Sequence, residues 1–324
     1  MLHRILPAAA LVLLASMAAS AEFQIDDDGQ QLTIRDGGEP VAVYHYGFVV
    51  PERKAQYRLR RACYFYPLYS PSGAVITEDF PVDHLHHRGL FWAWPEAKTG
   101  GRTMDTWLMP DCRQYHIAFE SRDAGPDSAS FVAKSRWAFD DTPDAGLLEE
   151  TVSVTFHAAT DGKRPMDLAI TLTNVTDAPF LLDGQSDGNK GYGGLCYRAA
   201  PAEGLPYAQR KDAEHSPYRF FTAQGGVGED QLEFDSPWVA LDAPAADERR
   251  AGAAIFQHPS LPGYPHHGWM LRHYGFLVQS WPHREPYTIE PGASVTLRYR
   301  VVLFDGPGSE AGLAEDYERF KAVD

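Results

Sequence analysis

One short segment of the sequence holds an unusual density of groups able to transfer protons. Residues 79–94 read DFPVDHLHHRGLFWAW. Because imidazole titrates near neutral pH, a histidine can serve as a catalytic acid or base. We therefore take His86 and His87 as the candidate catalytic groups, with Asp83 orienting them, and we expect Arg88 to hold an oxygen or carboxylate of the ligand.

The same histidines have alternative roles. On a strand, His84 and His86 would share one face with Arg88, and His87 would point to the other face. A pair on one face could chelate a divalent metal, since neutral imidazole suits zinc, copper, nickel or iron. It could equally bind an anion or sugar hydroxyls, or satisfy loop backbones in a polar core. The sequence requires no cofactor and leaves a divalent metal at His84 and His86 open.

A second segment, residues 263–282, repeats this mixture of histidines and aromatic rings. A sugar ring has an apolar face and a polar edge, so a sugar-binding cleft needs aromatic faces beside hydrogen-bonding groups. We expect the two segments to meet in one cleft. The substrate-binding residues predicted from them are His84, Arg88, Trp92, His266, His267, His273 and Trp281.

A third segment, residues 187–198, is rich in glycine and reads DGNKGYGGLCYR. It lacks both the dinucleotide-binding pattern before a helix and the Lys-Ser or Lys-Thr ending of a phosphate-binding loop. The segment is typical of a loop that enters a strand. Lys190 and Tyr192 are its candidates for the wall of a cleft.

Several reaction classes find no support. The sequence contains neither a GxSxG nucleophile elbow nor an HExxH metalloprotease motif. Its 44 acidic and 29 basic residues give a net charge of −15, which argues against a nucleic-acid partner. Glu149 and Glu150 are interpreted as solvated residues at the start of a strand.

The elements that must position these groups are strands. Residues 23–25 and 31–35 flank a turn signal, and residues 151–156 and 168–173 alternate with a period of two. Residues 294–304 form the longest alternating run. Helical periodicity is confined to a short C-terminal stretch, residues 310–323.

Many short strands between Gly- and Pro-rich turns predict an all-β protein. About 300 residues is long for a simple sandwich, and no linker divides the chain. We therefore expect residues 22–324 to form one domain, a large antiparallel β-supersandwich with a short C-terminal helix.

The N-terminus predicts an export signal over residues 1–21. His3 and Arg4 precede an apolar stretch that ends at a small-residue cleavage site, Ala19-Ser20-Ala21. The protein is therefore expected in the periplasm or outside the cell, with no membrane span in the mature chain. The cysteines Cys63, Cys112 and Cys196 are too few and too widely spaced for a disulfide framework, and three buried thiols are the favoured interpretation.

The motifs resemble the PmoA-type family of unknown function, which consists of secreted or periplasmic proteins of polysaccharide-degrading bacteria. The resemblance covers nearly the whole mature chain, and Leu85 stands where family members usually have proline. The family's label comes from a subunit of membrane methane monooxygenase, an integral membrane protein, so we reject methane oxidation. The matching strings are Pro67–Gly73, Thr77, Asp83–Leu90, Gly191–Leu195, Tyr274–Phe276 and Glu290–Gly292.

A more distant resemblance is to galactose-mutarotase-like supersandwich proteins. The histidine block, the strand end at residues 173–180 and a late strand after Pro291-Gly292 recur in the same order. This resemblance implies a sugar-binding concave sheet face. Mutarotases use a glutamate on a late strand as base, and the matching residues 278–281 contain none, which argues against simple aldose epimerisation.

These observations predict a carbohydrate-active protein with a carbohydrate ligand. The favoured hypothesis is an enzyme that acts on a glycoside or modified sugar by histidine-based hydrolysis, elimination or epimerisation. The alternatives are a non-catalytic carbohydrate-binding protein and a metal-dependent hydrolase or oxidase.

Overall fold

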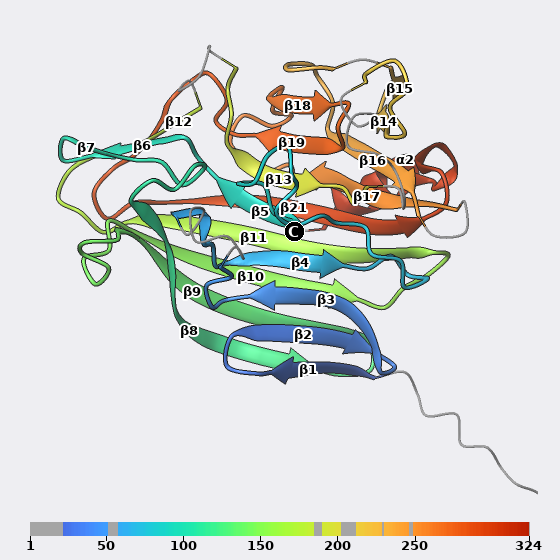
Figure 1. The fold of residues 1–324 in the computed structure, drawn as a ribbon, viewed down its shortest axis with the longest axis horizontal. Coiled ribbons are helices and arrows are strands. Elements are labelled where there is room, and N and C mark those ends of the chain that lie inside the picture. The colour runs from blue at the N-terminus through green and yellow to red at the C-terminus, as the bar shows by residue number, and fades with distance from the viewer. Residues whose placement is uncertain are drawn as a thin grey trace, which may run out of the picture.

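The computed structural model describes residues 22–50, 58–184, 190–201, 212–228, 230–245 and 249–323. The expected signal at residues 1–21 lies outside these ranges. Within them the strands form three antiparallel sheets of eight, nine and four strands. The predicted all-β class is confirmed, and the predicted short helix is present at the C-terminal end (Figure 1).

The first sheet carries the hairpin that the turn signal predicts. Its first two strands pair from Phe23 with Asp36 to Asp27 with Leu32. In spatial order, the eight strands are β1 (Phe23–Asp27), β2 (Gln31–Asp36), β3 (Glu39–His45), β4 (Tyr64–Leu68), β5 (Leu90–Ala93), β13 (Gly194–Arg198), β19 (Phe276–Ser280) and β18 (Trp269–Arg272).

The second sheet contains the longest alternating runs, residues 151–156, 168–173 and 294–304, all confirmed as strands. In spatial order, its nine strands are β15 (Gly225–Val227), β14 (Arg219–Thr222), β16 (Trp238–Pro244), β17 (Arg250–Gln257), β21 (Ser294–Asp305), β11 (Lys163–Asn174), β10 (Leu148–His157), β9 (Ser128–Phe139) and β8 (Cys112–Ala124).

A small third sheet lies at one end of the molecule (Figure 1). Its four strands are β20 (Tyr287–Ile289), β12 (Phe180–Asp183), β6 (Glu96–Thr99) and β7 (Arg102–Met104). A 3-10 turn, η3 (Gly308–Glu310), precedes the helix α2 (Leu313–Phe320). No helix in the described part of the chain has the length and apolar character that crossing a bilayer needs.

The main core lies between the first two sheets. Every second residue of β10 and β11 is buried, including Val152, Val154, Leu168 and Ile170, as the period of two requires. These side chains form one cluster with Phe65 and other residues of the first sheet. The contact between the two inner faces makes this pair of sheets a sandwich.

Both sheets also bury part of their outer faces. Helix α2 packs Leu313, Tyr317 and Phe320 against the outer face of the second sheet at β16, β17 and β21. On the first sheet, Leu90 and Trp92 of β5 point into the main core, whereas Phe91 and Ala93 belong to a separate cluster on the opposite face. This outer face of the first sheet supports the candidate site.

Candidate functional site

The histidine segment forms two consecutive turns. The His84 amide donates to the Pro81 carbonyl at 3.1 Å, and the His87 amide donates to the His84 carbonyl at 2.8 Å. Strand β5 begins only at Leu90, so the expectation that His84 and His86 share one strand face was wrong. Between these turns and β5, position 89 requires glycine because a Cβ there would overlap the Phe65 carbonyl oxygen.

Because the chain turns here, all three histidines reach one cavity of about 360 Å³ on the outer face of the first sheet. We call this cavity the histidine cleft. Its other walls come from the loop after β7, the segment before β13 and the β18–β19 hairpin. The lining residues are His84, His86, His87, Pro95, Asp105, Trp107, Leu108, Lys190, Tyr192, Met270, Arg272, Tyr274 and Phe276.

Stacked rings build much of the cleft wall. The His84 ring lies parallel to that of His87, with centroids 4.6 Å apart, and to that of Tyr274 at 4.7 Å. His87 in turn stacks on Phe276 at 3.9 Å. The cleft wall is therefore a packed array of aromatic and imidazole rings, which combines apolar surface with hydrogen-bonding groups.

Of the three histidines in the cleft, His84 is the one that lies beside a carboxylate. Its Nδ1 lies 3.1 Å from a carboxylate oxygen of Asp83, and its side chain is one-third exposed. The buried Asp83 carboxylate also accepts two hydrogen bonds from the Arg198 guanidinium, at 2.8 and 3.0 Å. Burial alone would raise the pKa of Asp83, but these contacts to His84 and Arg198 hold it well below its usual range. Asp83 thus contacts His84, where the sequence predicted that it would orient His86 or His87.

Burial favours the neutral form of the His86 and His87 imidazoles. Burial, together with the charges of His84, Arg61 and Arg198, lowers the pKa of His86 to about 3. Burial also lowers the pKa of the almost inaccessible His87 well below its ordinary value. Neutral imidazole can both donate and accept a hydrogen bond, so these two side chains can pair with hydroxyl groups.

Three predicted ligand-binding residues are buried outside the histidine cleft. The Arg88 guanidinium donates to both Asp79 oxygens at 2.9 Å. The Trp92 indole points into the main core, and the Trp281 indole donates to the Pro262 carbonyl at 3.1 Å. These hydrogen bonds within the fold offset the cost of burying the polar groups, and among the three side chains Arg88 Nε alone lacks a partner in the described residues.

The Trp92 indole donates to Glu150, a carboxylate buried between the two sheets. Gln114, Ser135 and Trp137 also donate to this carboxylate, at 2.8–3.0 Å. Burial raises the pKa of Glu150 despite these four donors. The interpretation of Glu150 as solvated was therefore wrong, whereas Glu149 is exposed.

His266 and His267 belong to a separate cluster. Their rings stack at 5.2 Å, and His267 Nε2 lies 3.5 Å from Glu233. Burial lowers the pKa of His266 to about 4. Neither residue lines the histidine cleft. The sequence missed His283 in this cluster, whose ring contacts the Gly191 carbonyl at 3.0 Å and so fixes the segment between Lys190 and Tyr192.

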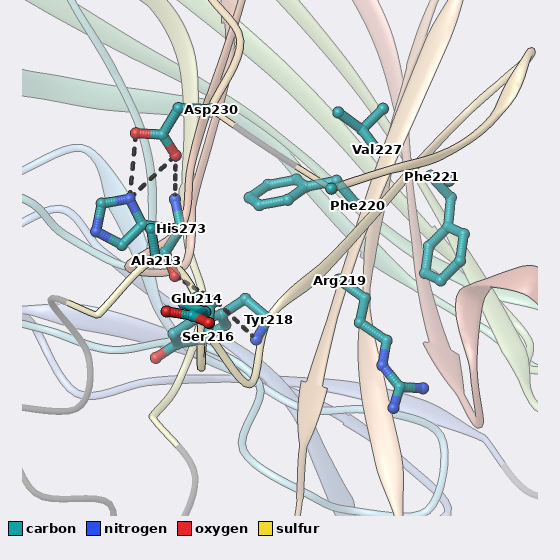
Figure 2. Close-up of a pocket in the computed structure, with 12 residues that line it drawn as sticks. Ala213, Glu214, Ser216, Tyr218, Arg219, Phe220, Phe221, Val227, Asp230 and His273 are labelled. Atoms are coloured by element: carbon teal, nitrogen blue, oxygen red, sulfur yellow. Dashed lines mark hydrogen bonds and ion pairs between the residues drawn. The ribbon is translucent and has the colours of Figure 1, made fainter.

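His273 faces a different hollow, of about 820 Å³, between β14, β15 and the segment before β14 (Figure 2). Figure 2 shows the Asp230 carboxylate turned toward His273, and both the backbone amide and the ring of His273 contact it, at 2.7 and 3.1 Å. The rings of Tyr218 and Phe220 form part of the hollow's lining. His273 therefore lies outside the histidine cleft.

Lys190 and Tyr192 line the histidine cleft, as the glycine-rich segment suggested. The Tyr192 ring stacks on Trp107 with centroids 5.4 Å apart. The sequence missed Asp105 and Trp107, which no motif distinguishes. It also missed Arg272 and Tyr274, although both lie inside the second segment that the sequence singled out.

A metal at His84 and His86 stays an untested prediction. The two rings lie 5.8 Å apart at a steep angle. In the ranges that the structure describes, no three His, Cys, Asp or Glu side chains converge in a group that could hold a metal ion.

A comparison with protein families identifies the family of this chain. A family model described as "Family of unknown function (DUF6807)" matches residues 31–318. The protein belongs to this DUF6807 family. The family's description does not carry the PmoA-type name that the motifs suggested. No curated protein matches the chain.

Among solved structures, an α-galactosidase from Lactobacillus brevis aligns with 89% of this chain at 9% identity and a TM-score of 0.39. The chain spans only 38% of that enzyme's length. A galactose mutarotase related enzyme from Lactobacillus acidophilus aligns over 89% of this chain and 99% of its own, at 7% identity and a TM-score of 0.38. An aldose epimerase homologue from C. elegans aligns over 89% and 99%, at 9% identity and a TM-score of 0.35. Likenesses this weak add nothing to the sandwich that the strand order and the core define.

Proposed function

We propose that this DUF6807 protein binds a sugar in the histidine cleft and acts on it by proton transfer through His84. The observation that carries the proposal is the pairing of the His84 imidazole, on the cleft wall, with the buried Asp83 carboxylate at 3.1 Å. An imidazole oriented by a carboxylate is a recurring device for acid–base catalysis.

The shape and chemistry of the cleft support a sugar ligand. Its volume of about 360 Å³ is within the range of small-molecule sites. Aromatic side chains such as Tyr192 and Tyr274 supply apolar surface to the lining, and His86 and His87, whose lowered pKa values favour the neutral form, offer donors and acceptors for hydroxyl groups. Apolar surface next to hydrogen-bonding groups suits a ring that has one apolar face and a polar edge.

The Asp83 contact determines which nitrogen of His84 would react. A proton on Nδ1 would lie next to the carboxylate, 3.1 Å away, although the two groups are not aligned as a hydrogen bond in this structure. The Nε2 lone pair is then left to accept a proton from the sugar. The two hydrogen bonds from Arg198 fix the carboxylate in turn. Asp83 and Arg198 are therefore positioning residues, and His84 replaces His86 and His87 as the proposed catalytic group.

A screen of glycosides and their keto forms for turnover tests the proposal. Once a substrate is found, His84→Gln should lower turnover by about 10²–10⁴-fold, the usual contribution of a general acid or base. His157→Gln is the matched control, because His157 and Asp167 form a similar pair at 2.7 Å on the outer face of the second sheet. Full turnover by His84→Gln would contradict the catalytic role.

A second candidate function is sugar binding without catalysis. It is favoured by the lowered pKa values of His86 and His87, because histidines that stay neutral bind hydroxyl groups but transfer protons poorly. A ligand that binds in the cleft and is recovered unchanged after prolonged incubation would support this candidate over the enzyme.

We also propose export to the periplasm or the medium, with residues 1–21 removed. The basic start, the apolar stretch and the small residues at the cleavage site support it. The intact mass of protein recovered from the periplasmic fraction checks this: export predicts a chain that begins at Glu22, and an uncleaved chain in the cytoplasm would contradict it.

A further inference from the structure

Two of the three charged side chains on the wall of the histidine cleft are cations. Lys190 and Arg272 line it, together with one carboxylate, Asp105. This balance contrasts with the chain as a whole, whose net charge is −15. Positive side chains gathered in a hollow of an acidic protein attract a negatively charged group.

Arg272 keeps most of its hydrogen-bonding capacity for a ligand. Its nearest acid is Asp230, which accepts one hydrogen bond from the guanidinium at 3.2 Å. Figure 2 shows that Asp230 faces His273, whose backbone amide is its closest partner at 2.7 Å. Because a guanidinium has five N–H donors, this single bond within the described residues leaves room for a carboxylate.

A third cation is buried next to the loop that carries Trp107 on the cleft wall. The buried Arg61 guanidinium lies 5.0 Å from the centroid of the Phe91 ring and donates only to backbone carbonyls, including that of Thr106 at 2.6 Å. In the part of the chain that the structure describes, its Nε and one terminal nitrogen have no hydrogen-bond partner, and it forms no ion pair. A buried charge without a counter-charge is costly, so an anion in the neighbouring cleft would stabilise it.

The single negative charge of Asp105 does not balance the positive charges of Lys190, Arg272 and Arg61. One of its oxygens accepts the backbone amides of Trp107 and Leu108, both at 2.8 Å, and so holds the loop that forms the cleft wall. Burial raises the pKa of Asp105. Its other oxygen can accept a hydrogen bond from a sugar hydroxyl, which a neutral or an acidic sugar would both supply.

We infer that the histidine cleft takes a sugar acid, with a hexuronate unit as its ligand. The carboxylate would lie between Arg272 and Lys190, while the aromatic rings contact the sugar ring and Asp105 accepts a hydrogen bond from a hydroxyl. This inference rests on the proposed function and names the ligand class for the same cleft.

Calorimetric titration of the full chain with galacturonate and glucuronate, each against galactose and glucose, tests the inference. At least one uronate should bind about tenfold more tightly than its neutral counterpart, since a hydrogen bond between charged groups adds roughly a tenfold gain in affinity. Added salt should weaken uronate binding and leave hexose binding unchanged. Lys190→Gln and Arg272→Gln should each reduce the preference, whereas Lys134→Gln, on β9 and paired with Glu120, should keep it.

Equal affinity for uronates and neutral hexoses would overturn the sugar-acid inference and leave the proposed sugar function standing. Failure of all four sugars to bind would also overturn it, and the His84→Gln turnover assay would then decide the proposed function separately. A preference that survives in both cleft variants would show that the carboxylate lies elsewhere and would overturn the assignment of Arg272 and Lys190.

Discussion

The three histidines of the cleft differ chemically because their neighbours differ. His84 has the Asp83 carboxylate at 3.1 Å and keeps one-third of its side chain exposed. His86 and His87 are more deeply buried, next to one another and near buried guanidinium groups, so both remain neutral. A segment with three similar residues therefore yields one candidate for proton transfer and two for hydrogen bonding.

The buried histidines should make stability depend on pH. The pKa of His86 is lowered from 6.5 to about 3 by folding, so the unfolded chain binds the proton more tightly. The contribution of His86 to the free energy of unfolding is fully present above pH 6.5 and is lost as the pH falls toward 3. We expect the free energy of unfolding to drop by about 1–2 kcal/mol between roughly pH 7 and pH 5 through this residue.

Urea denaturation at several pH values measures this effect. The variant His86→Gln should show a shallower loss of stability on acidification than the native protein, whereas His157→Gln, outside the cleft, should not. The same slope in the native protein and in His86→Gln would show that His86 titrates normally.

The buried carboxylate between the sheets should be important for stability. Replacing Glu150 by alanine removes the oxygen to which the indoles of Trp92 and Trp137 both donate and leaves these buried donors without their partner. We expect a loss of about 3 kcal/mol in the free energy of unfolding. The neighbouring exposed substitution Glu149→Ala is the control and should change it little. Equal effects of the two substitutions in urea titrations would contradict this role.

At the scale of the elements, the cleft is made by loops and one hairpin on a rigid sheet. Phe91, Cys196 and Val278 lie in one row across β5, β13 and β19 and form a buried floor. The walls that carry Lys190 and His84 have no regular secondary structure. Loop geometry at a few residues therefore determines the shape of the cleft.

Gly191 is one such residue. It has a φ of +67°, and a Cβ there would overlap the His283 imidazole. Gly191→Ala should displace Lys190 and Tyr192 and lower sugar affinity by about tenfold or more. Gly292→Ala is the matched control, because Gly292 has a φ of +73° but open space around it. Calorimetric titration of both variants with the best-binding sugar makes the comparison, and equal affinities would contradict the positioning role.

The sequence predicted the elements better than the site. Period-two alternation identifies β10, β11 and β21, because one face of each strand is buried. The same logic failed at His84 and His86, where the two turns replace a strand. Side-chain direction in a turn depends on local dihedral angles that alternation does not encode.

The cleft could be anticipated only in part. The two segments rich in histidine and aromatic residues do meet, but through Arg272 and Tyr274 rather than through His266 and His273. From the sequence alone, Trp92 could not be distinguished from an aromatic residue on the surface. The structure shows that it lies on the face of β5 that points into the main core. Residue type indicated which segments carry chemistry, whereas the sheet register decided which side chains face the cavity.

At the scale of the whole molecule, the sandwich leaves its thiols inaccessible. Cys63, Cys112 and Cys196 are all buried and free, as the sequence predicted. Burial raises the pKa of Cys63 and of Cys112 to about 12, so little thiolate exists near neutral pH. A thiol-reactive dye should label none of them in the native protein and all three in denaturant. Rapid labelling of the native protein would contradict this packing.

The central claim is that the histidine cleft, on the outer face of the first sheet, is where the ligand binds. A crystal structure of the protein soaked with galacturonate or galactose tests it most directly. We predict electron density for the sugar against Tyr274 and Trp107, within hydrogen-bond distance of His84. Density confined to the hollow beside Tyr218 and His273, with the histidine cleft free of sugar, would contradict the claim.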